Sequence, residues 1–381
     1  VAPTPAVAWI AARHGLCGAV ISASHNPWTD NGIKFFGPGG RKLSDELETE
    51  LAHRLDQLVA DDHALILGDP ADTAAPVADP VPILDPADEL RRWQDALLGS
   101  VTDASRGMRV VIDCANGALS AIAPRVLRDL GVDVEVLHAA PDGRNINDAC
   151  GSTHPADLQQ RVVASGASLG LAFDGDADRL LAVDETGAIV DGDHLLALFA
   201  GDLRDRGALR GDQVVVTVMT NLGFRRAMAD CGVEVVETPV GDRHVLEALA
   251  RTGGSLGGEQ SGHIVFADLA TTGDGLLSGL QLLDLVARRG RPLSALAAAA
   301  MTRFPQVLRN VAVGSPRRDV AELLAADIAR EEDLLGARGR ILLRPSGTEP
   351  LIRVMVEADS LETAEAVAGR LVTAVEQVCS A

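Results

Sequence analysis

Several markers of secreted, membrane and zinc proteins are missing from this chain of 381 residues. Its five cysteines are scattered, odd in number and without a C-x-x-C pair, which argues against a disulfide framework and a zinc site. No apolar run approaches the roughly 20 residues that span a bilayer. The N-terminus lacks the basic region and long apolar region of a signal peptide. We therefore expect a cytoplasmic protein.

Basic residues are also scarce. The chain has 34 lysines and arginines against 54 aspartates and glutamates, a net charge of −20. Nucleic acids and anionic membranes are held by basic surfaces, so this balance excludes both as partners. An anionic small molecule would bind only where local arginines or a divalent cation overcome the overall field.

Apolar residues, in contrast, make up 47% of the chain, which is ample for packed cores. The length suggests two to four domains. Helix and strand patterns alternate almost throughout, which predicts three similar α/β units with mixed sheets and a smaller α+β unit at the C-terminus. The segment 68–90, rich in proline, alanine and aspartate, is predicted to be a linker.

The loop "AFDGDADR" places Asp174, Asp176 and Asp178 at alternate positions between two strand-like segments. Three carboxylates this close repel one another unless a cation lies among them, and oxygen ligands favour Mg²⁺ or Ca²⁺ over zinc. An EF-hand numbering that starts at Asp174 fails because Arg179 stands where that loop needs glycine. A solvated acidic turn is the alternative.

The segment "GAVISASHNP" ends an apolar strand in two serines and a histidine. No G-x-S-x-G elbow surrounds Ser24, and its neighbour His25 points in a different direction, so a hydrolase dyad is not indicated. A serine without such a base, beside a Mg²⁺-type loop, suggests a phosphate carrier, with Ser22 as its support. A simple polar turn is the alternative.

Two further loops carry polar groups. "GGEQSGH" offers Glu259 and Ser261 for sugar hydroxyls, although a plain turn fits equally well. In "RPSGTEPLIR", Arg344 and Arg353 flank a Ser-Gly-Thr segment that can form an anion-binding nest. The second loop would allow an acidic protein to bind an anion, and a structural turn is its alternative.

Together and in this order, "SASHNP", "DGDADR", "GEQSGH" and "RPSGTEP" resemble the signatures of the α-D-phosphohexomutase superfamily. Gln260 and the stretches 271–283 and 141–155 are most similar to bacterial phosphoglucosamine mutases. The resemblance implies four domains around a central cleft, at 1–75, 80–188, 189–299 and 300–381. It implies a mutase that interconverts glucosamine 6-phosphate and glucosamine 1-phosphate through a phosphoserine, with Mg²⁺ and a hexose or hexosamine 1,6-bisphosphate primer.

The resemblance also implies a role for each loop. The catalytic group is Ser24, His25, Lys34 and Arg179; the metal group is Asp174, Asp176 and Asp178 with the Ser24 phosphate; the sugar group is Gly241, Asp242, Arg243, Glu259 and Ser261; and the phosphate group is Arg344, Ser346, Gly347, Thr348 and Arg353.

Two departures from the family pattern bear on these expectations. The family usually begins with a segment bearing "FGTDGxRG", which does not occur here, so we expect a reduced sheet in the first domain. His244 stands where relatives often carry tyrosine. The alternatives are a phosphoglucomutase or phosphomannomutase, a non-catalytic sugar-phosphate binder and, more distantly, a phosphatase. A monomer or homodimer is expected.

Overall fold

The computed structural model describes residues 1–61, 84–313, 319–345 and 350–380. Ser346, Gly347 and Thr348, all predicted to bind phosphate, lie outside the described residues. So does most of the predicted linker. No helix in the described ranges is both long and apolar enough to cross a membrane.

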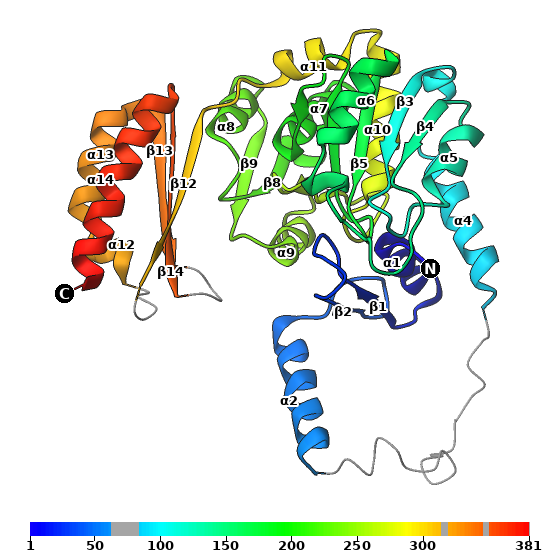
Figure 1. The fold of residues 1–381 in the computed structure, drawn as a ribbon, viewed down its shortest axis with the longest axis horizontal. Helices are drawn as coiled ribbons and strands as arrows, with labels where there is room; N and C mark the ends of the chain where they lie inside the picture. Colours follow the sequence, from blue (N-terminus) through cyan, green and yellow to red (C-terminus); the bar gives the residue numbers. More distant parts are fainter. Residues whose placement is uncertain (62–83, 314–318, 346–349, 381) are drawn as a thin grey trace.

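The first unit contains a small antiparallel sheet covered on one face by a helix (Figure 1). A compact core of alanines, one valine and one phenylalanine joins this helix to the sheet. Ser22 pairs with Gly32 at the sheet end, so the chain leaves the sheet just before Ser24. The elements are α1 (Thr4–His14), β1 (Gly18–Ser22), β2 (Gly32–Phe36) and α2 (Asp45–Asp61).

The second unit is built on five strands in the order β4-β3-β5-β6-β7. The first three are parallel and the last two antiparallel. Strand β5 is buried along its whole length, as expected for an apolar strand covered on both faces. The elements are α4 (Pro86–Leu98), η1 (Asp103–Ser105), β3 (Arg109–Asp113), α5 (Ala123–Asp129), β4 (Asp133–Leu137), η2 (Gly151–Thr153), α6 (Ala156–Ser165), β5 (Leu169–Phe173), β6 (Leu180–Asp184) and β7 (Ile189–Val190).

The third unit has four strands in the order β11-β10-β8-β9. It shares one hydrophobic core with the second unit, and every residue of helix α10 from Gly275 to Val286 is buried in it. The elements are α7 (Gly192–Asp205), η3 (Arg210–Asp212), β8 (Gln213–Thr217), α8 (Leu222–Asp230), β9 (Glu234–Thr238), α9 (Asp242–Thr252), β10 (Leu256–Gly258), β11 (Ile264–Phe266), α10 (Gly275–Arg289) and α11 (Leu293–Ala300).

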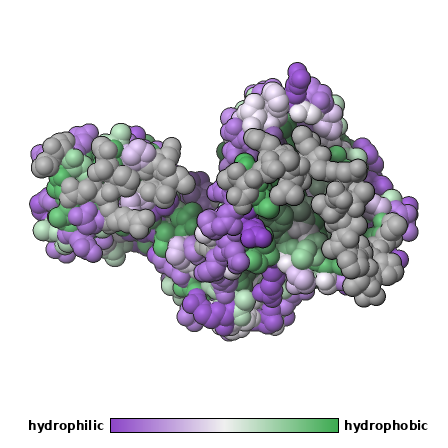
Figure 2. Space-filling model, turned by 90° about the horizontal axis from the view of Figure 1, so that it is seen from below, coloured by the Kyte–Doolittle hydropathy of each residue, from purple (hydrophilic) through white to green (hydrophobic). Residues whose placement is uncertain are grey.

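The residues from Gln306 onward form what we call the C-terminal unit. Its antiparallel strands lie in the order β12-β14-β13, and its helices pack on them around a separate core. Figures 1 and 2 show this unit as a lobe to one side of the rest. The elements are β12 (Gln306–Ala312), α12 (Val320–Leu323), α13 (Ala325–Leu335), η4 (Gly336–Arg338), β13 (Gly339–Pro345), β14 (Leu351–Ala358) and α14 (Leu361–Ser380).

The several mixed sheets and the smaller C-terminal unit confirm the predicted fold class. The exact division into four domains stays a prediction. The predicted linker, 68–90, extends too far at its C-terminal end. Residues 86–90 form the first turns of α4, and the Asp85 side chain accepts hydrogen bonds from the amides of Ala87 and Asp88.

Candidate active site

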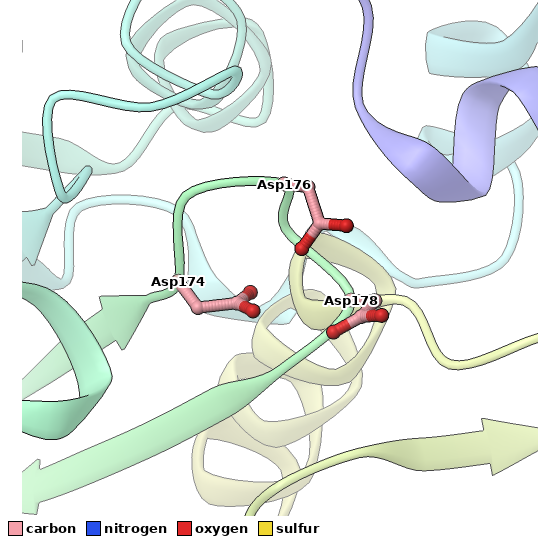
Figure 3. Close-up of side chains that lie close together, drawn as sticks. All are labelled: Asp174, Asp176 and Asp178. Carbon is pink, nitrogen blue, oxygen red and sulfur yellow. The ribbon is translucent and has the colours of Figure 1, made fainter. Parts of the chain in front are cut away.

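The three aspartates of the acidic loop converge between β5 and β6 (Figure 3). One carboxylate oxygen from each of Asp174, Asp176 and Asp178 lies within 4.8 Å of the other two. These three residues are only 1–3% exposed. These positions place three oxygen ligands around one point in a site with little water.

The donor set fits a hard divalent cation. Asp176 Oδ1 and Asp178 Oδ1 are buried and have no hydrogen-bond partner among the described residues. Asp174 Oδ2 faces the Ser24 hydroxyl at 3.5 Å. Buried carboxylate oxygens without partners are costly, and Mg²⁺ or Ca²⁺ would satisfy them.

Lys34 partly neutralises the cluster. Its ammonium nitrogen lies 2.6 Å from Asp176 Oδ2 and 2.8 Å from Asp178 Oδ2. Burial on its own would lower the pKa of Lys34, but the two carboxylates outweigh it and raise that pKa. Lys34 therefore stays charged, which suits charge stabilisation and not proton acceptance.

The pKa values of the outer two aspartates shift in opposite directions. Burial and the charges of Asp178 and Asp176 raise the pKa of Asp174 well above its usual range. Burial would also raise the pKa of Asp178, but His263 and Lys34 outweigh it and hold that pKa well below its usual range. Without a cation, ionising Asp174 is therefore the costly step.

Ser24 lies at the turn that follows β1, with its backbone in the left-handed region at a φ of 52°. The Ser24 amide donates to Ser22 Oγ at 2.8 Å, which is the supporting contact expected of Ser22. The Ser24 carbonyl accepts from the Gly175 amide at 3.1 Å and from Asn147 Nδ2 at 2.8 Å. The serine loop is thus tied directly to the acidic loop.

His25 and Arg179 stand beside this serine. His25 Nδ1 lies 3.4 Å from Ser24 Oγ, so the expectation that these two neighbouring side chains point in different directions is wrong. Burial and the nearby Arg179 lower the pKa of His25, so the ring is neutral at pH 7. The Arg179 amide donates to Asp174 Oδ1 at 3.1 Å, and its guanidinium Nε lies 3.9 Å from Asp178 Oδ1. A neutral base therefore lies next to the hydroxyl, and the Arg179 cation lies against the acidic loop.

The predicted sugar residues also come together. Glu259 Oε1 accepts a hydrogen bond from the Gly241 amide at 3.0 Å, and Ser261 Oγ lies 3.5 Å from Glu259 Oε2. Asp242 pairs with Lys42, which brings the start of α9 against the first unit. Arg243 pairs with Glu48 of α2 in the same way.

Arg344 and Arg353 lie opposite each other on β13 and β14. Burial and the neighbouring charge of Arg353 lower the pKa of Arg344. Two adjacent arginines favour an anion between them. Hydrogen bonds and an ion pair bring the serine, acidic and sugar loops together. The arginine pair lies on β13 and β14 of the C-terminal unit (Figure 1).

Three contacts were not foreseen from the sequence. Thr4 Oγ1 donates to Asp176 Oδ2 at 2.7 Å, Asn147 Nδ2 holds the Ser24 carbonyl, and His263 Nδ1 faces Asp178 Oδ1 at 3.7 Å. Each residue reaches the site from a distant part of the chain. Two of these residues lie in segments that the sequence analysis singled out, since His263 ends the "GEQSGH" loop and Asn147 belongs to the stretch 141–155.

A serine beside a carboxylate cluster, with an arginine pair on a further unit of an α/β fold of four sheets, is the set of groups that an enzyme transferring phosphate requires. The chain matches four models of one family. They are phosphoglucomutase/phosphomannomutase alpha/beta/alpha domain I at residues 1–60, domain II at 91–187, domain III at 191–304 and the C-terminal domain at 308–374. The chain belongs to the phosphoglucomutase/phosphomannomutase family.

Among curated proteins, the chain is similar to phosphoglucosamine mutases from several bacteria. It is 52% identical to that of Frankia alni, with 98% of this chain and 80% of the relative aligned. It is 49% identical to that of Pelotomaculum thermopropionicum, over 99% of this chain and 83% of the relative. It is 48% identical to that of Thermobifida fusca, over 100% of this chain and 82% of the relative.

Solved structures show the same fold at lower identity. A phosphoglucomutase/phosphomannomutase family protein from Burkholderia thailandensis aligns with a TM-score of 0.76 and 24% identity, over 99% of this chain and 81% of that one. N-acetylphosphoglucosamine mutase from Aspergillus fumigatus, in complex with GlcNAc-6P and magnesium, aligns with a TM-score of 0.74 and 21% identity. That alignment covers 99% of this chain and 92% of the other.

Proposed function

We propose that this chain is a phosphoglucosamine mutase, an isomerase that interconverts glucosamine 6-phosphate and glucosamine 1-phosphate. The observation that carries the proposal is the Ser24 hydroxyl, which faces the buried Asp174 carboxylate at 3.5 Å. The similarity to curated phosphoglucosamine mutases supports the choice of substrate.

In the proposed reaction, Ser24 carries the phosphoryl group. The bond between phosphorus and Ser24 Oγ breaks while a new bond forms to the C1 hydroxyl oxygen of glucosamine 6-phosphate. The proton of that hydroxyl passes to neutral His25, and His25 returns it to Ser24 Oγ, 3.4 Å from its Nδ1. The product is a bound 1,6-bisphosphate. After it turns over in the site, the 6-phosphate returns to Ser24 by the reverse steps and glucosamine 1-phosphate leaves.

The acidic loop would hold Mg²⁺ through Asp174, Asp176 and Asp178. When bound, the ion would neutralise charge on the transferring phosphoryl group. Arg179 and Lys34 would add positive charge at the same place. A hexose or hexosamine 1,6-bisphosphate would load the serine for the first turnover.

The remaining site residues would bind the two ends of the substrate. Glu259 and Ser261, with Gly241, Asp242 and Arg243 beside them, would contact the sugar hydroxyls. Arg344, Arg353 and the segment Ser346–Thr348 would bind the phosphate that does not react. An arginine pair binds either phosphate of a bisphosphate equally, which a reorienting intermediate requires.

The test compares the native chain with Ser24→Ala and Ser22→Ala after priming with glucose 1,6-bisphosphate. Intact mass should show one added phosphate on the native chain and on Ser22→Ala, and none on Ser24→Ala. Only the chains that carry phosphate should turn over glucosamine 6-phosphate in the presence of Mg²⁺.

Three results would contradict the proposal. A native chain that binds glucosamine 6-phosphate without carrying phosphate would be a non-catalytic binder. A higher kcat/KM for glucose or mannose phosphates would make it a phosphoglucomutase or phosphomannomutase. Release of inorganic phosphate without isomerisation would make it a phosphatase.

A further inference from the structure

A buried carboxylate lies where the C-terminal unit meets the third unit. Glu357 of β14 is fully buried. Its oxygens accept hydrogen bonds from the Leu222 amide at 2.8 Å, Asn221 Nδ2 at 3.1 Å and Gln306 Nε2 at 2.8 Å. They also accept from Arg340 Nε at 2.6 Å. Leu222 and Asn221 belong to the third unit, so this carboxylate joins the two units.

Arg340 of β13 makes the same connection with its other nitrogens. Its Nη1 donates to the Val218 carbonyl at 2.9 Å, and its Nη2 donates to the Thr220 carbonyl at 2.6 Å. Both carbonyls belong to the loop that follows β8. Because the guanidinium is a rigid planar fork, these bonds fix the direction of the arginine as well as its distance.

The chain that links the two units is held at the same place. Asn221 Oδ1 accepts from the Phe304 amide at 2.9 Å, and Asn221 Nδ2 donates to the Phe304 carbonyl at 3.0 Å. A Cβ on Gly223 would lie 1.9 Å from the Thr302 carbonyl oxygen, so only glycine permits this approach. We call Asn221, Arg340 and Glu357 the joint.

The strand register connects the joint to the arginine pair. In the β13–β14 ladder, Arg340 is opposite Glu357 and Arg344 is opposite Arg353. Both steps along the strands are four residues, an even number, so the two pairs lie on the same face of the sheet. Four residues at the rise of a β-strand separate the two pairs by about 13 Å. One stiff ladder therefore carries the joint at one end and the arginine pair at the other.

We propose that Arg340 is a positioning residue for substrate binding: by gripping Glu357 and the Val218 and Thr220 carbonyls, it sets where Arg344 and Arg353 stand relative to the serine and acidic loops. The inference rests on the proposed function, because it assumes that the arginine pair binds the substrate's non-reacting phosphate. Arg340 itself touches no substrate. Its loss weakens capture of the sugar phosphate and leaves the phosphoryl-transfer groups in place.

The main test variant is Arg340→Met combined with Glu357→Gln, which removes the ion pair without leaving a buried unpaired charge. KM for glucosamine 6-phosphate should rise about tenfold, with kcat within about threefold of the native value, since a misplaced binding group costs capture and not chemistry. Arg340→Lys keeps the charge but not the planar fork, so its KM should lie between those of the native chain and the main variant. The control is Arg338→Met, whose side chain is 70% exposed and pairs with Asp359 at 3.4 Å on the same unit.

A double-mutant comparison separates positioning from general stability. Arg344→Ala with Arg353→Ala removes the arginine pair and should lower kcat/KM strongly. If Arg340 acts through that pair, adding the joint substitutions to this variant should lower kcat/KM no further. The proposal would be overturned if the combined variant lost kcat/KM by the product of the two separate losses. It would also be overturned if the joint variant had an unchanged KM or was impaired only in kcat. Circular dichroism of every variant checks that the C-terminal unit remains folded.

Failure of the proposed function would look different. In that case the arginine-pair variant itself would bind glucosamine 6-phosphate as well as the native chain does. If the arginine-pair variant is impaired and the joint variant is not, only the positioning role of Arg340 is wrong.

Discussion

Ser24 is held in a backbone conformation that serine rarely adopts. Its φ of 52° lies in the left-handed region, which costs a non-glycine residue about 1 kcal/mol or more. Four hydrogen bonds compensate: Ser22 accepts from the Ser24 amide, Gly175 and Asn147 donate to the Ser24 carbonyl, and Asn147 also donates to the Asn26 carbonyl. The hydroxyl is therefore presented by a loop with little freedom to move.

Gly175→Ala should disturb this presentation selectively. A Cβ at Gly175 would lie 2.6 Å from the Ser24 carbonyl oxygen and 2.5 Å from Ile146, so the serine loop must shift. We expect kcat/KM to fall about 100-fold, the typical effect of misplacing a reacting group by about an ångström. Gly201→Ala on α7 is the control, because a Cβ there meets nothing within 4 Å. Equal activity of the two variants would show that the contact between loops is unimportant.

Asp174→Asn should raise the stability of the chain without Mg²⁺ and reduce the stability that Mg²⁺ adds. Without a divalent cation, the variant should melt at a higher temperature than the native chain, because burial and two neighbouring carboxylates make ionised Asp174 costly. With Mg²⁺ the native chain should gain more, since an ion at a hundredfold excess over its Kd adds about 2.7 kcal/mol.

Thermal melts in EDTA and in Mg²⁺ measure both effects. Asp133→Asn, with a side chain 73% exposed, is the control and should respond to Mg²⁺ as the native chain does. A native chain whose melting temperature ignores both Mg²⁺ and Ca²⁺ would argue against a cation among the aspartates.

At the scale of elements, the sequence predicted the strands that lead into the site better than the helices around them. The run at 169–173 is apolar and the aspartates follow directly, so strand and loop could be read together. The sequence analysis made no prediction for helix α1, which begins at Thr4 with a proline in its first turn, where proline is favourable. Pro86 stands in the same way at the start of α4, although the predicted linker included it.

Helix α10 offers a pH-dependent test. Its N-cap Asp274 accepts from the Leu277 amide at 2.9 Å and is buried, and burial raises its pKa from 3.8 to about 7. Between about pH 4 and pH 7 the folded chain binds this proton more tightly than the unfolded chain. The free energy of unfolding therefore falls as pH rises through that window. This group lowers it by on the order of 1 kcal/mol per pH unit.

Asp274→Asn keeps an oxygen for the cap and removes the titration. Urea unfolding at several pH values measures the free energy of unfolding of both proteins. The value for the variant should rise relative to that of the native chain from pH 4 to pH 7, with no further change above about pH 8. A constant difference across this range would mean that Asp274 titrates normally.

At the scale of the whole molecule, the placement of the C-terminal unit could not be read from the sequence. Arg340 and Glu357 are 17 residues apart on different strands, and each looks like an ordinary surface charge. Their pairing depends on a strand register and on carbonyls from a third segment. The division into four domains, the cytoplasmic location and the oligomeric state also stay predictions, because no single residue pattern determines them.

The separate core of the C-terminal unit predicts a composite unfolding transition. The second and third units share one core, whereas the C-terminal unit has its own and is joined mainly by polar contacts. Calorimetry should give a van't Hoff enthalpy below the calorimetric value. The joint variant, Arg340→Met with Glu357→Gln, should separate the two components further. A single two-state transition in both proteins would show that the cores unfold together.

The positions of the aromatic residues also have an optical consequence. The chain contains no tyrosine, and its three tryptophans, Trp9, Trp28 and Trp93, all precede the third unit. Protein fluorescence excited at the indole band is therefore blind to the C-terminal unit. Phe304, whose ring centroid lies 4.5 Å from the Arg226 guanidinium carbon, is an aromatic position whose backbone amide and carbonyl both bond the Asn221 side chain. An indole placed there would report by its emission how the arginine-bearing lobe is seated when a sugar phosphate binds.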